Sequence, residues 1–209
     1  MANIIAVVWD FDKTLVDGYM QDPIFEYYGI NAHDFWTEVN ALPKKYKEEQ
    51  GVLVNPDTIY LNQFIRYAKS GKFKGLTNEK LKEFGEQLKF YKGVPEIFQK
   101  TKDLIEKNSI YQEYDIKVEH YIVSTGMSQI IRGSSVMPYV ENIWGCELIE
   151  GKDDAGDPCI SEIGFRFLYK GIIIKHNKTE PTYTKTSLFL CEKRRFFMAR
   201  TEKGVVTTI

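Results

Sequence analysis

The stretch IIAVVWDFDKTL, residues 4–15, decides how the rest of the sequence is interpreted. Residues 4–9 are apolar and mostly β-branched, which is typical of a central strand buried on both faces of a parallel sheet. Asp10 and Asp12 follow directly. Because ligands of open α/β sheets bind at the carboxyl ends of strands, we expect both carboxylates at the edge where an active site forms. Residues two apart in an extended segment point the same way, so both side chains can address one substrate.

Two carboxylates at such an edge suit phosphate chemistry. One can attack phosphorus to give an aspartyl-phosphate, and the other can protonate the leaving oxygen and later activate water. A pair of acids facing a phosphate also needs a cation, and oxygen ligands of this kind suit Mg²⁺. Asp-x-Asp alone is common and could be an acidic strand end leading into a turn. The apolar strand followed by DFDKTL is much more specific.

A second pattern, VSTG at residues 123–126, follows a predicted strand over 118–123 and precedes a predicted short helix over 127–132. A hydroxyl group and backbone N–H groups at a helix N-terminus can hold a phosphate. The alternative is an ordinary N-cap, a frequent role of Ser and Thr. Together with residues 10–15, the phosphate cradle is the favoured interpretation.

The remaining patterns predict an interrupted α/β core. Four helices are predicted in a row without a strand between them, over 23–28, 32–49, 57–69 and 78–91. A helix over 94–107, a strand over 143–149, a turn over 151–157, a strand over 163–169, a helix over 185–200 and a strand over 205–209 are predicted to follow. This order predicts a core made of residues 1–16 and 92–209, with a helical cap over residues 17–91.

Composition narrows the class of protein. The 209 residues include 28 Lys and Arg against 29 Asp and Glu, so a net charge of −1 gives no reason to expect a nucleic-acid or membrane partner. No apolar run approaches the roughly 20 residues of a membrane-spanning helix. Cys146, Cys159 and Cys191 are widely spaced and outside any CxxC pattern. They are typical of free thiols in a reducing compartment, so we expect a cytoplasmic protein. The oligomeric state is left open.

From residue 4 to about 186 the chain resembles the haloacid dehalogenase-like (HAD) hydrolase superfamily, most closely its phosphoserine-phosphatase-like branch. The first family motif, a strand followed by DxDx(T/V), matches Asp10, Asp12 and Thr14. The second, a strand followed by Ser or Thr, matches residues 124–126. YKGVPE at 91–96 resembles the segment that re-enters the core after a cap. The resemblance implies a Rossmann-like, mostly parallel sheet with an inserted α-helical cap and a β-ribbon after the second motif.

The resemblance also implies roles for individual residues. Asp10 is expected to be the nucleophile and Asp12 the general acid and base. Asp10 and the backbone carbonyl of Asp12 are expected to bind Mg²⁺. Ser124, together with Thr125 and Gly126, is expected to bind the phosphate of the substrate.

The third and fourth family motifs are matched less completely. The third is a lysine that neutralises charge in the transition state, for which Lys185 is the favoured match, with Lys170 and Lys175 as alternatives. The fourth is an acidic pair that completes the metal site. Beyond Lys185 the only acids are Glu192 and Glu202, and no Asp occurs. We therefore expect the fourth motif to be missing, through truncation, frameshift or divergence, and turnover to be strongly reduced.

The resulting hypothesis is a Mg²⁺-dependent phosphomonoesterase that acts on a small phosphorylated metabolite through an aspartyl-phosphate. A non-catalytic or truncated remnant that at most binds its ligand is one alternative, and a phosphotransferase or mutase is another. Phosphoserine is not favoured as substrate, because Tyr19 stands where the branch places an acid that binds the substrate amine. In the cap, Arg66 could bind a substrate carboxylate or pair on a helix surface. Trp36 could face a substrate or belong to the core.

Overall fold

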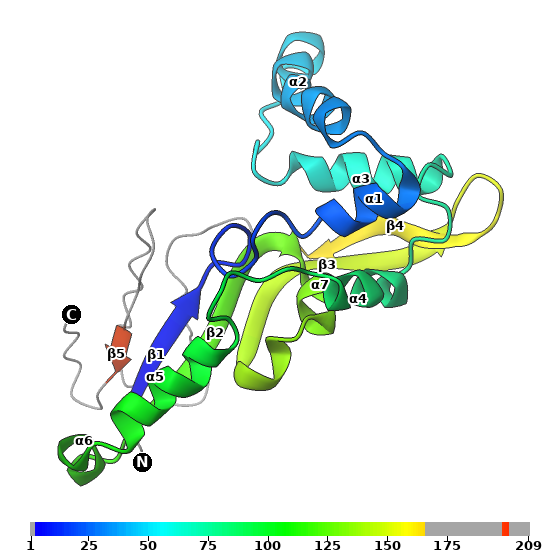
Figure 1. The fold of residues 1–209 in the computed structure, drawn as a ribbon. Helices are drawn as coiled ribbons and strands as arrows, with labels where there is room; N and C mark the ends of the chain where they lie inside the picture. The colour runs from blue at the N-terminus through cyan, green and yellow to red at the C-terminus, as the bar shows by residue number, and fades with distance from the viewer. Residues whose placement is uncertain (1–2, 166–197, 201–209) are drawn as a thin grey trace.

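The computed structural model describes residues 3–165 and 198–200, and within them the strands form one sheet in the order β4-β3-β2-β1-β5 (Figure 1). Their bounds are Asn3–Trp9 (β1), Ile116–Met127 (β2), Asn142–Lys152 (β3), Pro158–Phe165 (β4) and Met198–Arg200 (β5). β1 pairs in parallel with β2, and β2 with β3, whereas β4 and β5 are antiparallel edge strands. The predicted α/β fold, with a parallel Rossmann-like centre, an inserted helical segment and a β-ribbon, is confirmed.

The inserted helices between β1 and the rest of the core are α1 (Asp22–Tyr28), α2 (Ala32–Gln50), α3 (Ile59–Lys69) and α4 (Asn78–Glu86). The core continues through α5 (Glu96–Glu106), α6 (Ser109–Glu113), α7 (Ser128–Gly133) and a 3₁₀ turn, η1 (Met137–Tyr139). The short helix α6 was not predicted, and α4 ends at Glu86 rather than near residue 91. No helix within the described ranges is long and apolar enough to cross a membrane.

The β-ribbon returns earlier than predicted. The backbone N–H of Asp153 donates to the Asp157 carbonyl at 2.8 Å, and Asp153 Oδ1 accepts from the N–H groups of Ala155 and Asp157 at 2.9 and 2.8 Å. Gly156 takes the positive φ of 91° that this turn needs. Because these bonds close the turn at residue 157, the returning strand begins at Pro158 and not at residue 163.

The predicted helix over 185–200 is wrong at its C-terminal end. Residues 198–200 form β5, which pairs antiparallel with β1 in the register Ile5 to Ala199. This pairing gives hydrogen-bond partners to the edge of β1 that faces away from β2. Residues 185–197 and the predicted strand over 205–209 lie outside the described residues, as does Lys185.

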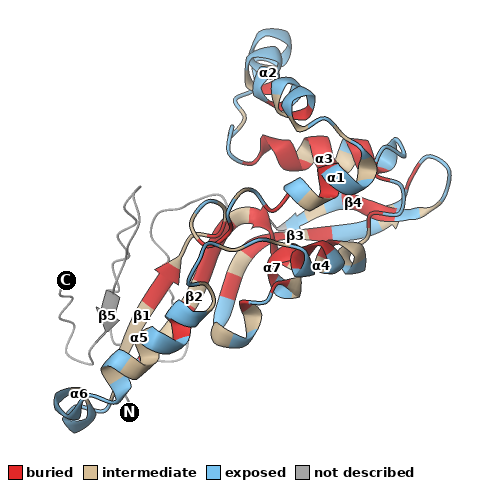
Figure 2. Ribbon diagram, in the orientation of Figure 1, coloured by how far each residue is buried: buried red, intermediate tan, exposed pale blue. Residues whose placement is uncertain are grey.

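The inserted helices have an aromatic core of their own. The ring centroids of Phe25 and Phe35 lie 4.9 Å apart, those of Phe35 and Phe64 5.2 Å, and those of Phe64 and Phe73 5.0 Å. All four side chains are buried, and Figure 2 shows most of α3 in the colour of buried residues. Tilted or edge-on aromatic pairs contribute about 0.5–1.5 kcal/mol each beyond their buried area. These ring contacts stabilise the packing of the inserted helices against one another.

The ribbon of β3 and β4 packs on these helices rather than projecting alone into solvent. In Figure 1 the far ends of both strands lie beside α3, which contacts β4. The Ile160 N–H donates to the Leu76 carbonyl at 2.7 Å, and the Asp154 N–H donates to the Lys69 carbonyl at 3.0 Å. Lys74 and Asp157 form an ion pair at 3.1 Å. The ribbon and the helical insertion therefore support each other.

Helices α4 and α7 cross with their backbones in contact. A Cβ atom on Gly133 would lie 2.0 Å from the Lys82 carbonyl oxygen, and one on Gly85 would lie 2.2 Å from the Ile130 carbonyl oxygen. Neither neighbour is a flexible side chain that could move aside. The two glycines therefore permit the close contact that joins the inserted segment to the core.

We expect Gly133→Ala to lower the free energy of unfolding by about 1–3 kcal/mol, because overpacking forces the backbones apart. Intrinsic helix propensity alone favours Ala, so a loss of stability would report the crowding. Chemical denaturation measures the change. Glu86→Ala, at an exposed position of α4, is the matched control and should stay close to wild type. An unchanged Gly133→Ala variant would contradict the close contact.

His120 of β2 has a buried, neutral imidazole side chain. The Trp9 indole N–H donates to His120 Nδ1 at 3.1 Å, and His120 Nε2 lies 3.1 Å from the Phe98 carbonyl oxygen. Because an indole only donates, Nδ1 must accept, which assigns the proton to Nε2. Burial lowers the pKa of His120 to about 4. The folded protein therefore takes up the second imidazole proton, which makes the ring cationic, less readily than the unfolded chain does.

The stability of the protein should depend on pH through His120. Above the ordinary pKa of 6.5 the imidazole is neutral in both states, and its contribution to stability is fully present. As the pH falls from 6.5 toward 4, the unfolded chain takes up the proton and stability is lost, by up to roughly 3 kcal/mol. Denaturation at several pH values should give a flatter profile for His120→Gln. The exposed His33→Gln variant should keep the wild-type slope, and equal slopes in all three would refute this.

Candidate active site

The two predicted motifs meet at one edge of the sheet. β1 and β2 are parallel and in register, with Trp9 beside Ile122. Asp10 follows Trp9 directly, and Ser124 comes two residues after Ile122, so the two residues lie toward the carboxyl ends of adjacent parallel strands. Asp10 and Asp12 are half-buried and Ser124 is buried. The structure thus places the carboxylate pair and the segment 124–126 toward the same end of adjacent strands.

The segment 124–126 lies in a bulge of β2. Val123 pairs with Trp144 and Met127 pairs with Cys146, so three residues of β2 stand opposite the single residue Gly145. A Cβ on Gly145 would lie 3.1 Å from the Gly126 carbonyl oxygen, so this residue leaves room for the bulge. Bulges interrupt the hydrogen-bonded ladder and redirect side chains.

The bulge corrects one prediction about the cradle. The sequence placed Ser124 where the strand gives way to a helix. In the structure β2 continues through Met127 and α7 begins only at Ser128. The Ser124 hydroxyl instead accepts a hydrogen bond from the Gly126 N–H at 3.0 Å. This bond uses a lone pair of the hydroxyl oxygen and not its hydrogen.

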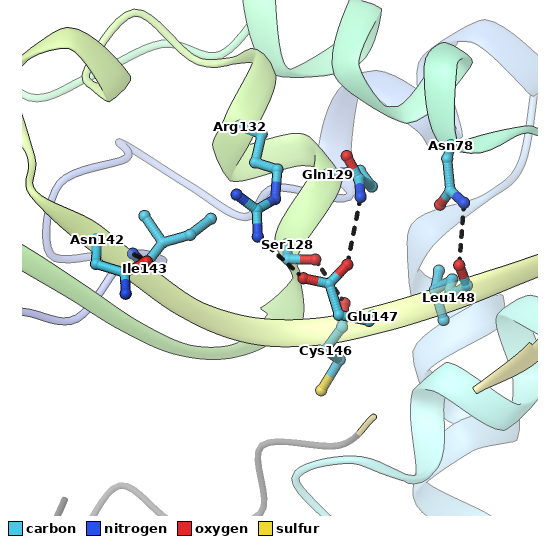
Figure 3. A network of polar contacts seen from close by, with 9 residues as sticks. All are labelled: Asn78, Ser128, Gln129, Arg132, Asn142, Ile143, Cys146, Glu147 and Leu148. Carbon is cyan, nitrogen blue, oxygen red and sulfur yellow. Dashed lines mark hydrogen bonds and ion pairs between the residues drawn. The ribbon is translucent and has the colours of Figure 1, made fainter. Parts of the chain in front are cut away.

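The far side of the bulge is held by α7 and β3. The Ser128 hydroxyl donates to the Cys146 carbonyl at 3.1 Å, while Gln129 and Arg132 contact the Glu147 carboxylate at 3.3 and 3.2 Å (Figure 3). Asn78 of α4 donates to the Leu148 carbonyl at 3.0 Å. These contacts fix the strand opposite the bulge, and with it the surface on which residues 124–126 rest.

A tight turn follows the first carboxylate. The N–H groups of Thr14, Leu15 and Val16 all lie within 3.3 Å of the Phe11 carbonyl oxygen. Lys13 has a φ of 56°, a left-handed conformation that costs a non-glycine residue about 1–2 kcal/mol. The turn reverses the chain immediately after β1 and keeps Asp12 at the sheet edge.

The two ends of the inserted segment are joined beside this turn. The Tyr91 N–H donates to the Leu15 carbonyl at 3.0 Å, and the Asp17 N–H donates to the Lys89 carbonyl at 2.8 Å. Val16 and Phe90 form an antiparallel bridge. The insertion therefore leaves and re-enters the core at one place, next to the carboxylate pair.

Met20 connects the two motifs. Its N–H donates to Asp12 Oδ1 at 2.9 Å, and its sulfur accepts from the Met127 N–H at 3.2 Å. The same thioether lies against Gly126, where an added Cβ would be 2.4 Å from the sulfur. The sequence alone does not indicate the role of Met20, because nothing in the pattern distinguishes a methionine between two motifs from one in the core.

Aromatic side chains of the insertion line one side of the site. The Trp36 ring centroid lies 6.0 Å from that of Tyr19 and 5.6 Å from that of Tyr60. Lys13 Nζ lies 4.1 Å from the Tyr19 ring centroid, and its hydrogen bond with the Tyr19 side chain raises the pKa of Lys13. Trp36 thus lies between Tyr19, beside the turn, and Tyr60, whose hydroxyl reaches the bulge.

The Tyr60 hydroxyl donates to the Thr125 carbonyl at 3.4 Å. Burial, with the nearby Asp12 carboxylate, raises the pKa of Tyr60 well above its usual range, so the phenol stays protonated. The sequence alone does not indicate the role of Tyr60, since a tyrosine on the apolar face of a helix carries no local signal of its partner. Helix α3 therefore contributes a polar group to the segment 124–126.

Arg66 forms side-chain contacts on the helix surface, which is one of its two predicted roles. Its guanidinium contacts the Gln63 side-chain oxygen and the Tyr46 hydroxyl, and it lies 5.7 Å from the Tyr46 ring centroid. These partners belong to α2 and α3, so the structure gives no support to a carboxylate-binding role.

The described part of the chain brings few side chains together that could bind a metal ion. Across residues 3–165 and 198–200, no group of three or more His, Cys, Asp or Glu side chains could hold a metal ion. Mg²⁺ commonly keeps several waters and uses one or two carboxylates together with substrate phosphate. Asp10 and Asp12 fit that kind of site. The predicted Lys185, its alternatives Lys170 and Lys175, and the acids beyond them lie outside the described residues.

No protein-family model matches the chain. An uncharacterized protein of Borreliella burgdorferi is 36% identical over 148 residues, covering 71% of this chain and 51% of that protein. The chain therefore spans about half the length of this relative.

Several solved structures are similar to this chain, at lower sequence identity than the Borreliella burgdorferi protein. A phosphoserine phosphatase with a phospho-aspartyl intermediate analogue has a TM-score of 0.47 and 16% identity, over 78% of this chain and 62% of that one. A HAD family hydrolase from Salmonella enterica serovar Typhi has 0.44 and 15%, over 78% and 45%. Cytosolic 5′-nucleotidase IIIB bound to cytidine has 0.38 and 14%, over 79% and 55%. Because every TM-score is below 0.5 and every identity below 20%, these proteins do not fix the activity of this chain.

Met20→Ala should lower the free energy of unfolding by about 2–5 kcal/mol, because it leaves a cavity between Asp12 and the bulge. Met20→Leu keeps most of the volume and should cost about 1 kcal/mol. Both lose the sulfur that accepts from the Met127 N–H. Urea denaturation of the two variants separates packing from the sulfur contact. Equal losses would show that the contact, and not the buried volume, holds the two motifs together.

Proposed function

We propose that this chain is a HAD-like phosphatase that hydrolyses small phosphate monoesters with Mg²⁺. The observation that carries the proposal is that the Asp10–Asp12 pair and Ser124 follow Trp9 and Ile122, which are paired residues of the adjacent parallel strands β1 and β2. An attacking group, a proton donor and a phosphate-binding hydroxyl are the parts that monoester hydrolysis requires.

In the proposed reaction, an Asp10 carboxylate oxygen attacks phosphorus while the bond from phosphorus to the leaving oxygen breaks. Asp12 gives a proton to that oxygen, and the alcohol leaves. Asp12 then takes a proton from water, which attacks the phosphorus of the aspartyl-phosphate and releases phosphate and Asp10. The Met20 N–H bonded to Asp12 Oδ1 supports this role, since it holds the carboxylate in one orientation beside the substrate.

The charges of the proposed reaction need compensation. Asp10 and Asp12 would hold Mg²⁺, which supplies the positive charge that two carboxylates and a phosphate require. We propose that the Ser124 hydroxyl donates to a phosphoryl oxygen and that Lys185 adds a further cation.

The aromatic side of the site favours small substrates. Ring contacts join Tyr19, Trp36 and Tyr60 next to the carboxylate pair. These rings therefore narrow the space through which a substrate can reach the carboxylates from the side of the inserted helices. The proposed substrate is therefore a small phosphorylated metabolite.

Asp10→Asn should abolish turnover of p-nitrophenyl phosphate in the presence of Mg²⁺, with a loss on the order of 10³-fold or more, because an amide cannot form the aspartyl-phosphate. Asp17→Asn, at an exposed position of the same segment, is the matched control and should keep the wild-type rate. Release of p-nitrophenol is measured by absorbance, and free phosphate in parallel.

The result distinguishes the proposal from its alternatives. Equal residual rates in wild type and Asp10→Asn would contradict the enzyme and favour a protein that only binds phosphate ligands. Release of p-nitrophenol that depends on an added alcohol, without matching free phosphate, would favour phosphoryl transfer to a second substrate.

A further inference from the structure

The Thr125 carbonyl oxygen is held from two sides. The Tyr60 hydroxyl of α3 donates to it at 3.4 Å, and the Cys146 thiol of β3 donates at 3.3 Å. Tyr60 belongs to the inserted helices and Cys146 to the sheet. One backbone carbonyl of the bulge therefore connects the insertion to the core.

This carbonyl belongs to the same peptide group as the Gly126 N–H. A trans peptide is rigid and planar, with its C=O and N–H pointing in opposite directions. Donors that fix the carbonyl on one side therefore fix the direction of the N–H on the other. That N–H donates to the Ser124 hydroxyl oxygen at 3.0 Å. Because it occupies a lone pair of the oxygen, it favours an orientation in which the hydroxyl hydrogen points elsewhere.

We propose that Tyr60 is a positioning residue for phosphate binding: through the Thr125–Gly126 peptide group it orients the Ser124 hydroxyl to donate to a phosphoryl oxygen. This inference rests on the proposed function of Ser124. Each hydrogen bond in such a series polarises the next, so the Tyr60 hydroxyl also strengthens the last donor. Tyr60 itself need not touch the substrate.

Tyr60 is firmly placed for this role. Its side chain is 5% exposed, and its ring packs between Trp36 at 5.6 Å and Phe64 at 6.0 Å between centroids. The Tyr60 hydroxyl has one hydrogen, and the Thr125 carbonyl oxygen at 3.4 Å accepts it.

The test is a double-mutant cycle on the full chain. Tyr60→Phe removes only the hydroxyl, Ser124→Ala removes its proposed target, and the double variant combines them. Tyr67→Phe is the matched control, because this tyrosine lies on the same helix but donates to Glu38 at 2.8 Å. Calorimetric titration with inorganic phosphate in the presence of Mg²⁺ gives the dissociation constant of each variant. Thermal unfolding reports whether the fold is intact.

We expect Tyr60→Phe to weaken phosphate binding about 3–10-fold, the range of one lost neutral hydrogen bond, and Tyr67→Phe to leave it unchanged. In the Ser124→Ala background, Tyr60→Phe should have no further effect, because the two residues act through one peptide group. A purely structural contribution of Tyr60 would instead persist in that background. Additive effects, or wild-type affinity in Tyr60→Phe, would overturn the inference and leave the phosphatase proposal standing.

Two further outcomes are also decisive. If wild type neither binds phosphate nor hydrolyses p-nitrophenyl phosphate, the proposed function fails, and the role of Tyr60 fails with it. If Tyr60→Phe unfolds at a much lower temperature than Tyr67→Phe, Cys146→Ala removes the other donor to the same carbonyl. Weaker phosphate binding in Cys146→Ala that disappears in the Ser124→Ala background supports the inference, and unchanged affinity overturns it.

Discussion

The parallel pairing of β1 with β2 is the interaction on which the candidate site depends. These two strands are far apart in sequence, and the whole helical insertion lies between them. Because both end at the same edge, Asp10 and the segment 124–126 become neighbours. A one-residue slip in this register would turn every side chain of a strand to the opposite face, so the buried strand residues also fix the geometry of the site.

Once that edge exists, its polar groups are oriented by residues that belong to neither motif. The bulge in β2 frees residues 124–126 from the ladder, and Gly145 gives them room. Met20 then bonds to Asp12 on one side and to the Met127 N–H on the other. Tyr60 approaches from α3 and donates to the bulge. The arrangement is preorganised, because each polar group has a partner that defines its direction.

The helical insertion is held to the core by contacts at several places, so it can orient groups of the candidate site. Its two ends are bonded to each other beside the carboxylate pair, and α4 crosses α7 at glycine contacts that leave no space for a side chain. The β-ribbon closes the arrangement from the far side through backbone bonds to residues 69 and 76. Helices that carry site residues such as Tyr60 are therefore fixed relative to the sheet by both chain connection and packing.

The sequence by itself determined the α/β class, the helical insertion, the order of the main elements as far as the β-ribbon and the strands after which Asp10, Asp12 and Ser124 lie, because apolar periodicity and strand ends are local signals. It misplaced the start of β4 and the conformation of residues 198–200, and it put Ser124 at a helix N-terminus. Those features depend on hydrogen bonds between distant segments, such as the pairing of β5 with β1. Only the tertiary structure revealed the bulge and the partners Met20 and Tyr60. A bulge is defined by the strand opposite it, and a buried methionine or tyrosine acquires its partner only when the chain folds.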